Sequence, residues 1–271
     1  MTSDDVGKAV LEKLGLLVRK LPELRDTKRA DFIAKRDELT LLVEAKLRED
    51  SPDELKRMEK ELDTAGVSWS KHRLGNNNSL SDTIRQAVMQ LDAEQEEPHD
   101  YTVLLLLAVC SNPGVVCEQI ADTLYGTTSV QVPKPDRSGV QQIPCYFYRE
   151  SEFHRASSLD AAIVGFEENG DWALALCLNP FSSRFEKVRA SALARMFEGR
   201  TVDPIAQEML GNALIPDKDA PRPSGPQKKL ERMFSTMDLM LRHLEKKYGF
   251  SPFSLTQGHL HKPMLRLRLP L

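Results

Sequence analysis

The sequence predicts an α/β protein in which helices flank a mixed β-sheet. Every second residue over 39–47 is apolar, which is the period of a strand. The apolar run over 103–110 is far shorter than the roughly 20 residues that cross a bilayer, so it indicates a buried strand. Apolar residues recur at helical spacing over 5–21 and 80–91. Strands interspersed with amphipathic helices are typical of this class.

The first half of the chain is expected to form a helix, a hairpin, two helices and a strand, in that order. The first helix ends at Pro22, which cannot continue it. The third element begins at the capping signature formed by Ser51, Pro52 and Glu54, and Gly66 ends it. The predicted segments are helix 5–21, hairpin strands 30–34 and 39–47 with a turn at 35–38, helices 51–64 and 80–91, strand 101–109, and 67–69 as a candidate for a further core strand.

Turn-forming residues divide the second half. Residues 126–142 are rich in them and predict a loop, whereas the Asn-Gly pair at 169–170 predicts a hairpin turn. Beyond this loop we expect strands 143–148, 159–166 and 172–178, helical segments 191–197 and 204–210, and a helix over 228–248 that ends at Gly249. The predicted organisation is a core (1–125), an α+β extension with an antiparallel meander (126–215), a linker (216–227) and a basic C-terminal helix and tail (228–271).

Composition and charge exclude several classes of protein. The 271 residues carry 37 Lys plus Arg against 40 Asp plus Glu, a net charge of −3, which excludes a wholly basic nucleic-acid coat and an acidic tail protein. The 28% charged residues exclude a membrane bundle. No secretion signal is visible in the first twenty residues and the four cysteines are scattered, so we expect a cytoplasmic, reduced protein that contacts no membrane.

The charges are unevenly distributed along the chain. From Arg222 onward there are ten Lys plus Arg against three Asp plus Glu, a net +7, which leaves −10 for the remainder of the total of −3. Such a basic tail can contact phosphate, an acidic partner or the acidic body of its own chain. A solvated helix with a frayed end explains the same pattern.

The residues with catalytic potential lie in the predicted hairpin. Glu44 and Lys46 are two residues apart, so they share one face of their strand. An antiparallel turn at 35–38 brings Asp31 on the preceding strand close to Glu44. Two carboxylates and an ammonium then meet on one face. Two alternatives remain open: a surface hairpin with exposed ion pairs, and an all-helical segment, since Ala, Leu, Glu and Lys favour helices.

This pattern resembles the motif of the PD-(D/E)xK nuclease superfamily, the restriction-endonuclease-like fold. Here it reads Asp31, twelve residues, then Glu44-Ala45-Lys46, with Ala30 where the family usually has proline. The resemblance covers about residues 5–109 and implies an αβββαβ core. It also implies a Mg²⁺ or Mn²⁺ ion held by Asp31, Glu44 and the carbonyl of Ala45, and a Lys46 that orients or deprotonates the attacking water.

Other side chains are weaker candidates for the same site. Members of the superfamily often add a glutamate from the first helix, here Glu12, and a glutamine from a later helix, here Gln86 or Gln90. Glu12 falls opposite the apolar face of its helix, which favours a solvated glutamate, and an exposed position on the helix surface explains each glutamine at least as well. Basic residues in two polar segments are candidates for phosphate contacts, although solvated loop charge is the ordinary explanation: Lys35, Arg36, Lys71, His72 and Arg73.

Two functions from different classes follow. The first is a Mg²⁺-dependent nuclease that cleaves DNA, as the effector subunit of a bacterial defence or restriction-type complex, with a protein partner that docks on the C-terminal half and restrains or activates it. A homo-oligomer is compatible with this hypothesis. The second is a non-catalytic interaction or assembly protein on the same fold. Whether the side chains of Asp31, Glu44 and Lys46 meet in the structure distinguishes the two.

Overall fold

The computed structural model describes residues 2–22, 29–66, 78–134, 136, 138–168, 170–220, 222, 230–250, 254–256 and 265–268. Within these ranges, eight strands form one mixed sheet in the order β1-β2-β3-β4-β7-β8-β11, with β9 beside β8. The first three strands are antiparallel, β3, β4 and β7 are parallel, and β8 is antiparallel to β7. The strands are β1 (Leu17–Lys20), β2 (Phe32–Arg36), β3 (Leu39–Glu49), β4 (Tyr101–Val109), β7 (Ala161–Glu168), β8 (Asp171–Leu178), β9 (Thr201–Val202) and β11 (Leu265–Arg268).

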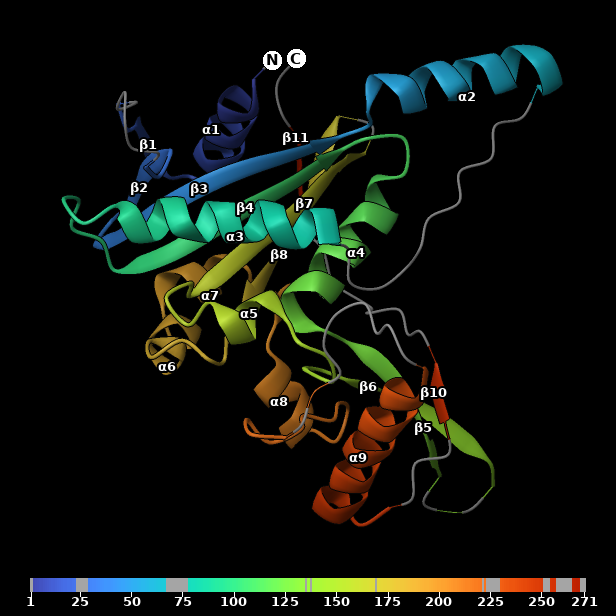
Figure 1. Cartoon of the computed structure of the whole chain (residues 1–271). Helices are drawn as coiled ribbons and strands as arrows, with labels where there is room; N and C mark the ends of the chain where they lie inside the picture. Colours follow the sequence, from blue (N-terminus) through green and yellow to red (C-terminus); the bar gives the residue numbers. More distant parts are fainter. Residues whose placement is uncertain are drawn as a thin grey trace.

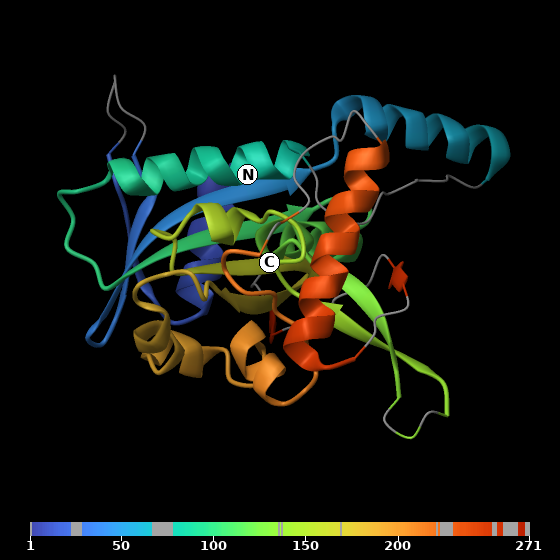
Figure 2. The same ribbon diagram turned by 60° about the horizontal axis from the view of Figure 1, so that its bottom comes forward.

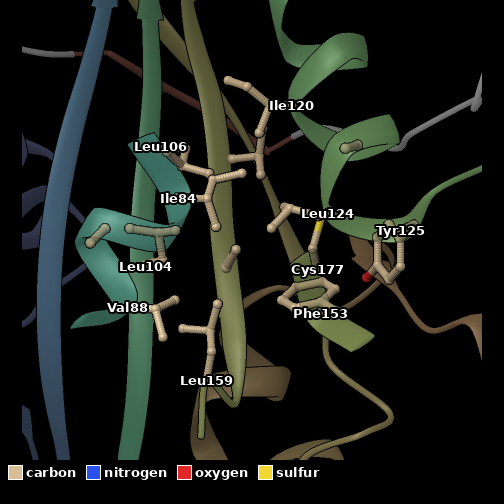
Figure 3. Close-up of a cluster of buried hydrophobic side chains, with 14 of the residues drawn as sticks. Ile84, Val88, Leu104, Leu106, Ile120, Leu124, Tyr125, Phe153, Leu159 and Cys177 are labelled. Atoms are coloured by element: carbon tan, nitrogen blue, oxygen red, sulfur yellow. The ribbon is translucent and has the colours of Figure 1, made fainter. Parts of the chain in front are cut away.

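Helices cover both faces of this sheet, as the sequence predicts for an α/β protein (Figures 1 and 2). One face packs against α3 (Asn78–Ala93), α4 (Pro113–Tyr125) and α5 (Glu152–Arg155), and the other against α1 (Ser3–Lys13), α6 (Phe185–Arg189) and α7 (Ala192–Met196). Figure 3 shows the first core, where Ile84 and Val88 of α3 meet Leu104 and Leu106 of β4. Alternation within β3 supplies both cores, because Leu42 faces α3 and Leu41 faces α1.

A smaller unit of three strands and a helix lies beside the main sheet. Its strands have the order β10 (Ser254–Thr256), β5 (Thr128–Pro133) and β6 (Val140–Cys145), and α9 (Leu230–Tyr248) packs on them (Figure 2). Val130, Tyr148, Met240 and Leu244 are among the buried residues that form its own hydrophobic core. The short helix α8 (Pro204–Met209) contacts this unit through Glu208, which pairs with Lys247 of α9 at 2.9 Å.

The helix α2 (Pro52–Ala65) contrasts with the others, because none of its residues is buried. The predicted capping box is present: the Ser51 hydroxyl accepts a hydrogen bond from the Glu54 N–H, and the Glu54 carboxylate accepts one from the Ser51 N–H. Gly66 ends the helix in the left-handed conformation that glycine favours, with φ of 67°. In both ribbon views α2 extends away from the sheet (Figures 1 and 2).

The predicted first helix over 5–21 is wrong in its second half. The helix α1 ends at Lys13, Gly15 adopts a φ of 81°, and β1 follows. Glycine at this left-handed position reverses the chain, and the apolar residues that follow it at helical spacing belong to a strand. Leu17 is 81% exposed, which is why a helix with one continuous apolar face does not describe this segment.

The predicted boundary at residue 126 is also corrected. Residues 128–145 form the β5–β6 hairpin, and the turn formers occupy only its tip, where the Lys134 N–H donates to the Gly139 carbonyl at 2.9 Å. The predicted meander does not form a separate extension, because β7 pairs with β4 in the main sheet. The predicted helices and strands are confirmed, with small shifts of their ends, over 30–47, 51–65, 78–109, 161–178 and 230–248. The candidate strand at 67–69 lies outside the described residues.

Candidate active site

Asp31 and Glu44 meet where β2 begins and β3 continues past it. The strand pairing of the hairpin ends at Phe32 and Val43, so the N–H of Ala45 has no partner on β2. Asp31 replaces that partner, since its Oδ2 accepts a hydrogen bond from the Ala45 N–H at 2.9 Å. The residue before the strand therefore positions its carboxylate by binding the backbone of the neighbouring strand.

Glu44 is the most unusual residue of this site, since its exposed fraction is 0%. One carboxylate oxygen, Oε1, accepts a hydrogen bond from Nζ of Lys46. The other, Oε2, accepts from no donor among the described residues, although the Glu44 and Asp31 carboxyl groups are close enough to share a hydrogen bond when one of them holds a proton. A buried carboxylate with one oxygen that lacks a donor costs free energy that the rest of the fold must offset.

Gln90 of α3 joins the site from the helix that covers this face. Its amide oxygen accepts from Lys46 Nζ at 3.2 Å, and its amide nitrogen donates to the Arg29 carbonyl at 3.4 Å. The backbone of Arg29 thereby fixes the glutamine, and the glutamine orients the lysine. The sequence-predicted Asp31, Glu44, Lys46 and Gln90 are thus brought together.

Burial raises the pKa of both carboxyl groups. Burial first, and then the charge of Asp31, raise the pKa of Glu44 from 4.5 to about 8, against the opposing effect of Lys46. Burial also raises the pKa of Asp31, while the Ala45 N–H and Lys46 oppose that rise. Two acids that resist ionisation side by side are expected to hold a proton between them at neutral pH, or to bind a cation that favours the charged form.

The N-terminus of α1 packs against Ala45, on the face of β3 opposite Glu44, a contact that the sequence analysis did not predict. Gly7 permits the approach, because a Cβ built at this position would lie 2.8 Å from the Cβ of Ala45. The Ser3 hydroxyl donates to the Ala45 carbonyl at 3.4 Å. Asp4 pairs with Lys20 of β1 at 2.6 Å, and its charge contributes to the raised pKa of Asp31. The acid that the first helix contributes near the site is therefore Asp4.

Other predicted residues lie elsewhere. Glu12 is exposed and pairs with Lys8 at 3.8 Å, so its proposed accessory role is wrong, and Gln86 is exposed on α3. Lys35 and Arg36 lie at the turn of the hairpin, about 15 Å from Asp31 at the rise of a strand. Arg36 donates to the Leu14 carbonyl at 3.3 Å and so stabilises the end of α1. Lys71, His72 and Arg73 lie outside the described residues.

The donor set fits a hard divalent cation better than a softer metal. Asp31 and Glu44 offer oxygen ligands, and the carbonyl of Ala45 directly follows Glu44 in the sequence. No group of three or more His, Cys, Asp or Glu residues gathers as a metal cage in the described part of the chain. Mg²⁺ does not need such a cage, because it keeps several waters and takes further ligands from a substrate phosphate.

Comparison with known proteins adds no relative: no family model, no curated protein and no solved structure matches this chain. Among the described helices, none has the length and apolar character that a membrane span requires.

Proposed function

We propose that this chain is a metal-dependent phosphodiesterase that cleaves DNA. The observation that carries the proposal is the carboxylate of Glu44, which is fully buried beside Asp31 and leaves Oε2 without a donor among the described residues. Burial of such a group costs several kcal/mol unless a charge compensates it. Lys46 compensates one oxygen, and a divalent cation held by Asp31 and Glu44 would compensate the other.

The arrangement of the elements supports the same proposal. From α1 to β4 the chain runs through a helix, three antiparallel strands, two helices and a strand parallel to β3. This order is similar to the αβββαβ core that the resemblance to the PD-(D/E)xK superfamily implies, with α2 as an additional helix before α3. Asp31 precedes the second strand and Glu44-Ala45-Lys46 lies in the third, which is where that motif requires them.

Each side chain has a distinct role in this proposal. Asp31 and Glu44 would hold Mg²⁺ or Mn²⁺, which when bound supplies a Lewis acid for a phosphate oxygen and a nucleophile at neutral pH. Lys46 provides an ammonium that donates a proton or a hydrogen bond to oxygens on which negative charge grows. Gln90 keeps Nζ of Lys46 in place at 3.2 Å. Loss of any of the first three removes a group that the reaction needs.

The burial of Glu44 supports control by a partner. Asp31 and Lys46 are partly exposed, but Glu44 is fully buried on the face of β3 that α3 covers, so a DNA phosphate would reach its carboxylate only after α3 moves. The net charge of −3 also disfavours unassisted binding of DNA. We extend the proposal accordingly: the chain is the effector subunit of a bacterial defence or restriction-type complex, and a protein partner docked on its C-terminal half opens the site.

The test is a cleavage assay on the full chain, with and without the product of the neighbouring gene. Plasmid DNA, linear DNA and single-stranded RNA are incubated with the protein in Mg²⁺, in Mn²⁺ and in EDTA. We expect Asp31→Asn, Glu44→Gln and Lys46→Ala each to slow cleavage by at least about 100-fold. The matched controls Glu12→Gln and Lys13→Ala change exposed residues of α1 and should cleave normally. Equal cleavage by all five variants would place the activity elsewhere or in a contaminant.

The complete burial of Glu44 also favours a second function, a non-catalytic assembly protein. In that case the ion pair between Glu44 and Lys46 is structural and no cation enters. A calorimetric titration with Mn²⁺ separates the two, because the proposed enzyme binds the ion and loses binding in Asp31→Asn. If the chain is an assembly protein, neither the native chain nor Asp31→Asn should give a heat of Mn²⁺ binding.

A further inference from the structure

The exposed helix α2 carries a continuous apolar face that no other described element covers. Leu55, Met58, Leu62 and Ala65 follow the three- and four-residue spacing of a heptad seam. Leu55 is 51% exposed and Leu62 is 50% exposed. These four residues, called the α2 face below, lie outside the candidate active site and serve no part of the proposed function.

An isolated helix of this length needs a partner to be stable. Isolated helices shorter than about 12–15 residues are only marginally stable in water, because the hydrogen bonds of a few turns do not offset the free energy needed to nucleate the helix. With 14 residues and none of them buried, α2 is supported by its capping box, its C-terminal Gly66 and contacts within the helix such as the Arg57–Glu61 pair, and not by burial. The two caps stabilise the ends of the helix but bury none of its residues. Burial of the α2 face against a second helix would supply the missing stabilisation.

The charges beside the α2 face identify the chemistry of that partner. At 100° per residue, acidic residues border the face on both sides, while Lys56, Arg57 and Lys60 lie opposite it. One of the bordering acids, Glu61, contacts Arg57 at 3.8 Å. The bordering residues are Glu54, Glu59 and Glu61. We propose that the α2 face docks an amphipathic helix of another protein whose apolar seam is flanked by Lys and Arg.

A second copy of the same helix does not meet this requirement. In a parallel pair, Glu54 of one copy would lie opposite Glu59 of the other. In an antiparallel pair, Glu54 would lie opposite Glu61. Both arrangements place like charges beside the seam and disfavour pairing of α2 with itself. The acidic borders therefore select a basic partner and oppose self-association through this face.

The test uses the full chain and two designed helical peptides of about three heptads, with leucine and isoleucine at the seam. One peptide carries lysine at the flanking positions and the other carries glutamate. Binding is measured by fluorescence anisotropy of the labelled peptide. We expect the lysine peptide to bind at least about tenfold more tightly, and the double variant Leu55→Ser/Leu62→Ser to lose at least about tenfold in affinity for it. The double variant Glu59→Lys/Glu61→Lys should prefer the glutamate peptide.

Controls distinguish this interaction from non-specific hydrophobic binding. Met89 of α3 is 70% exposed, so Met89→Ser removes a comparable apolar surface and should leave peptide binding unchanged. Sedimentation should show the same mass for the native chain and the double serine variant. Equal affinity for both peptides, or unchanged binding by the double serine variant, would overturn the proposal. A dimer that dissociates in that variant would assign the α2 face to a second copy and overturn it as well.

Discussion

Replacement of Glu44 by glutamine tests the electrostatics of the candidate site directly. The glutamine keeps the size of the side chain and can still accept from Lys46, but it carries no titratable proton. In the folded chain the pKa of Glu44 is raised from 4.5 to about 8. A raised pKa means that the contribution of the protonated carboxyl to stability is fully present below about pH 4.5 and is lost as the pH rises through about 8.

The size of this effect follows from the shift. Each unit of pKa difference corresponds to about 1.4 kcal/mol, so a rise from 4.5 to about 8 is worth up to about 5 kcal/mol above pH 8. Between about pH 5 and pH 8 the native chain should therefore lose roughly 4 kcal/mol relative to Glu44→Gln. Carboxyl groups that do not interact with Glu44 titrate alike in both chains and cancel in the difference, whereas Asp31 interacts with Glu44 and contributes to it.

Urea denaturation of both chains at several pH values, in EDTA, measures this difference. We expect the free energy of unfolding of Glu44→Gln minus that of the native chain to increase steadily with pH and to level off above about pH 8. Asp31→Asn removes the charge of Asp31, which is the second cause of the raised pKa of Glu44. In a chain that carries Asp31→Asn, the effect of Glu44→Gln on the free energy of unfolding should therefore vary less steeply with pH. Glu12→Gln, on the exposed side of α1, should give none.

Saturating Mg²⁺ adds a second measurement to the same design. At a concentration about 100 times its dissociation constant, the ion should stabilise the native chain by about 2.7 kcal/mol at pH 8 and leave Glu44→Gln nearly unchanged. A difference between the two chains that does not vary with pH would refute the electrostatic argument. An ion that stabilises both chains equally would refute the cation site while leaving that argument intact.

Three further predictions concern the packing that holds the site. Gly7→Ala should destabilise the fold by about 1–3 kcal/mol in urea denaturation, although alanine favours helices, because its Cβ would lie 2.8 Å from that of Ala45; a gain in stability would contradict the close approach. Tyr125→Phe should cost about 1–1.5 kcal/mol by the same measurement, since the buried hydroxyl donates to two carbonyls, at 2.9 and 3.1 Å; no loss would mean that water replaces the bond. Glu152→Gln should cost about 1–2 kcal/mol and raise the hydrogen exchange of α5, because two arginines, from α3 and α5, bind this buried carboxylate; unchanged exchange would show that the contact does not tether α5.

The hairpin of the candidate site was predictable because two sequence signals agreed there. Alternation of apolar residues over 39–47 defined the strand, and the polar tetrad at 35–38 defined the turn. The register followed from these two signals, and with it the meeting of Asp31 and Glu44. Helical spacing also placed Gln86 and Gln90 beside the apolar stripe of α3, but the sequence could not tell that Gln90 reaches Lys46 and that Gln86 is exposed.

The contribution of α1 could not be predicted because it depends on a long-range approach. Gly15 resembles a residue inside a helix when it is read with its neighbours, yet its positive φ ends α1 and begins β1. With that turn missed, Asp4 had no predicted neighbour, and Glu12 was the acid well inside the helix. The signals that could have corrected this are Gly15 as a helix terminus and Gly7 as a point of close packing.

Two features of this chain reduce its stability as an isolated molecule, and each indicates binding. On the face of β3 that meets α3, Leu42 packs in an apolar core, yet the next residue on that face is Glu44, whose burial raises its pKa. On α2, apolar residues at heptad spacing are exposed to solvent, and glutamates border them on both sides. Selection for stability alone favours an apolar residue at the first position and polar residues at the second. A cation bound by Glu44 would explain the buried carboxylate, and a basic helix bound to α2 would explain the exposed apolar face. Because α2 makes no contribution to the candidate site, either explanation can be refuted without affecting the other.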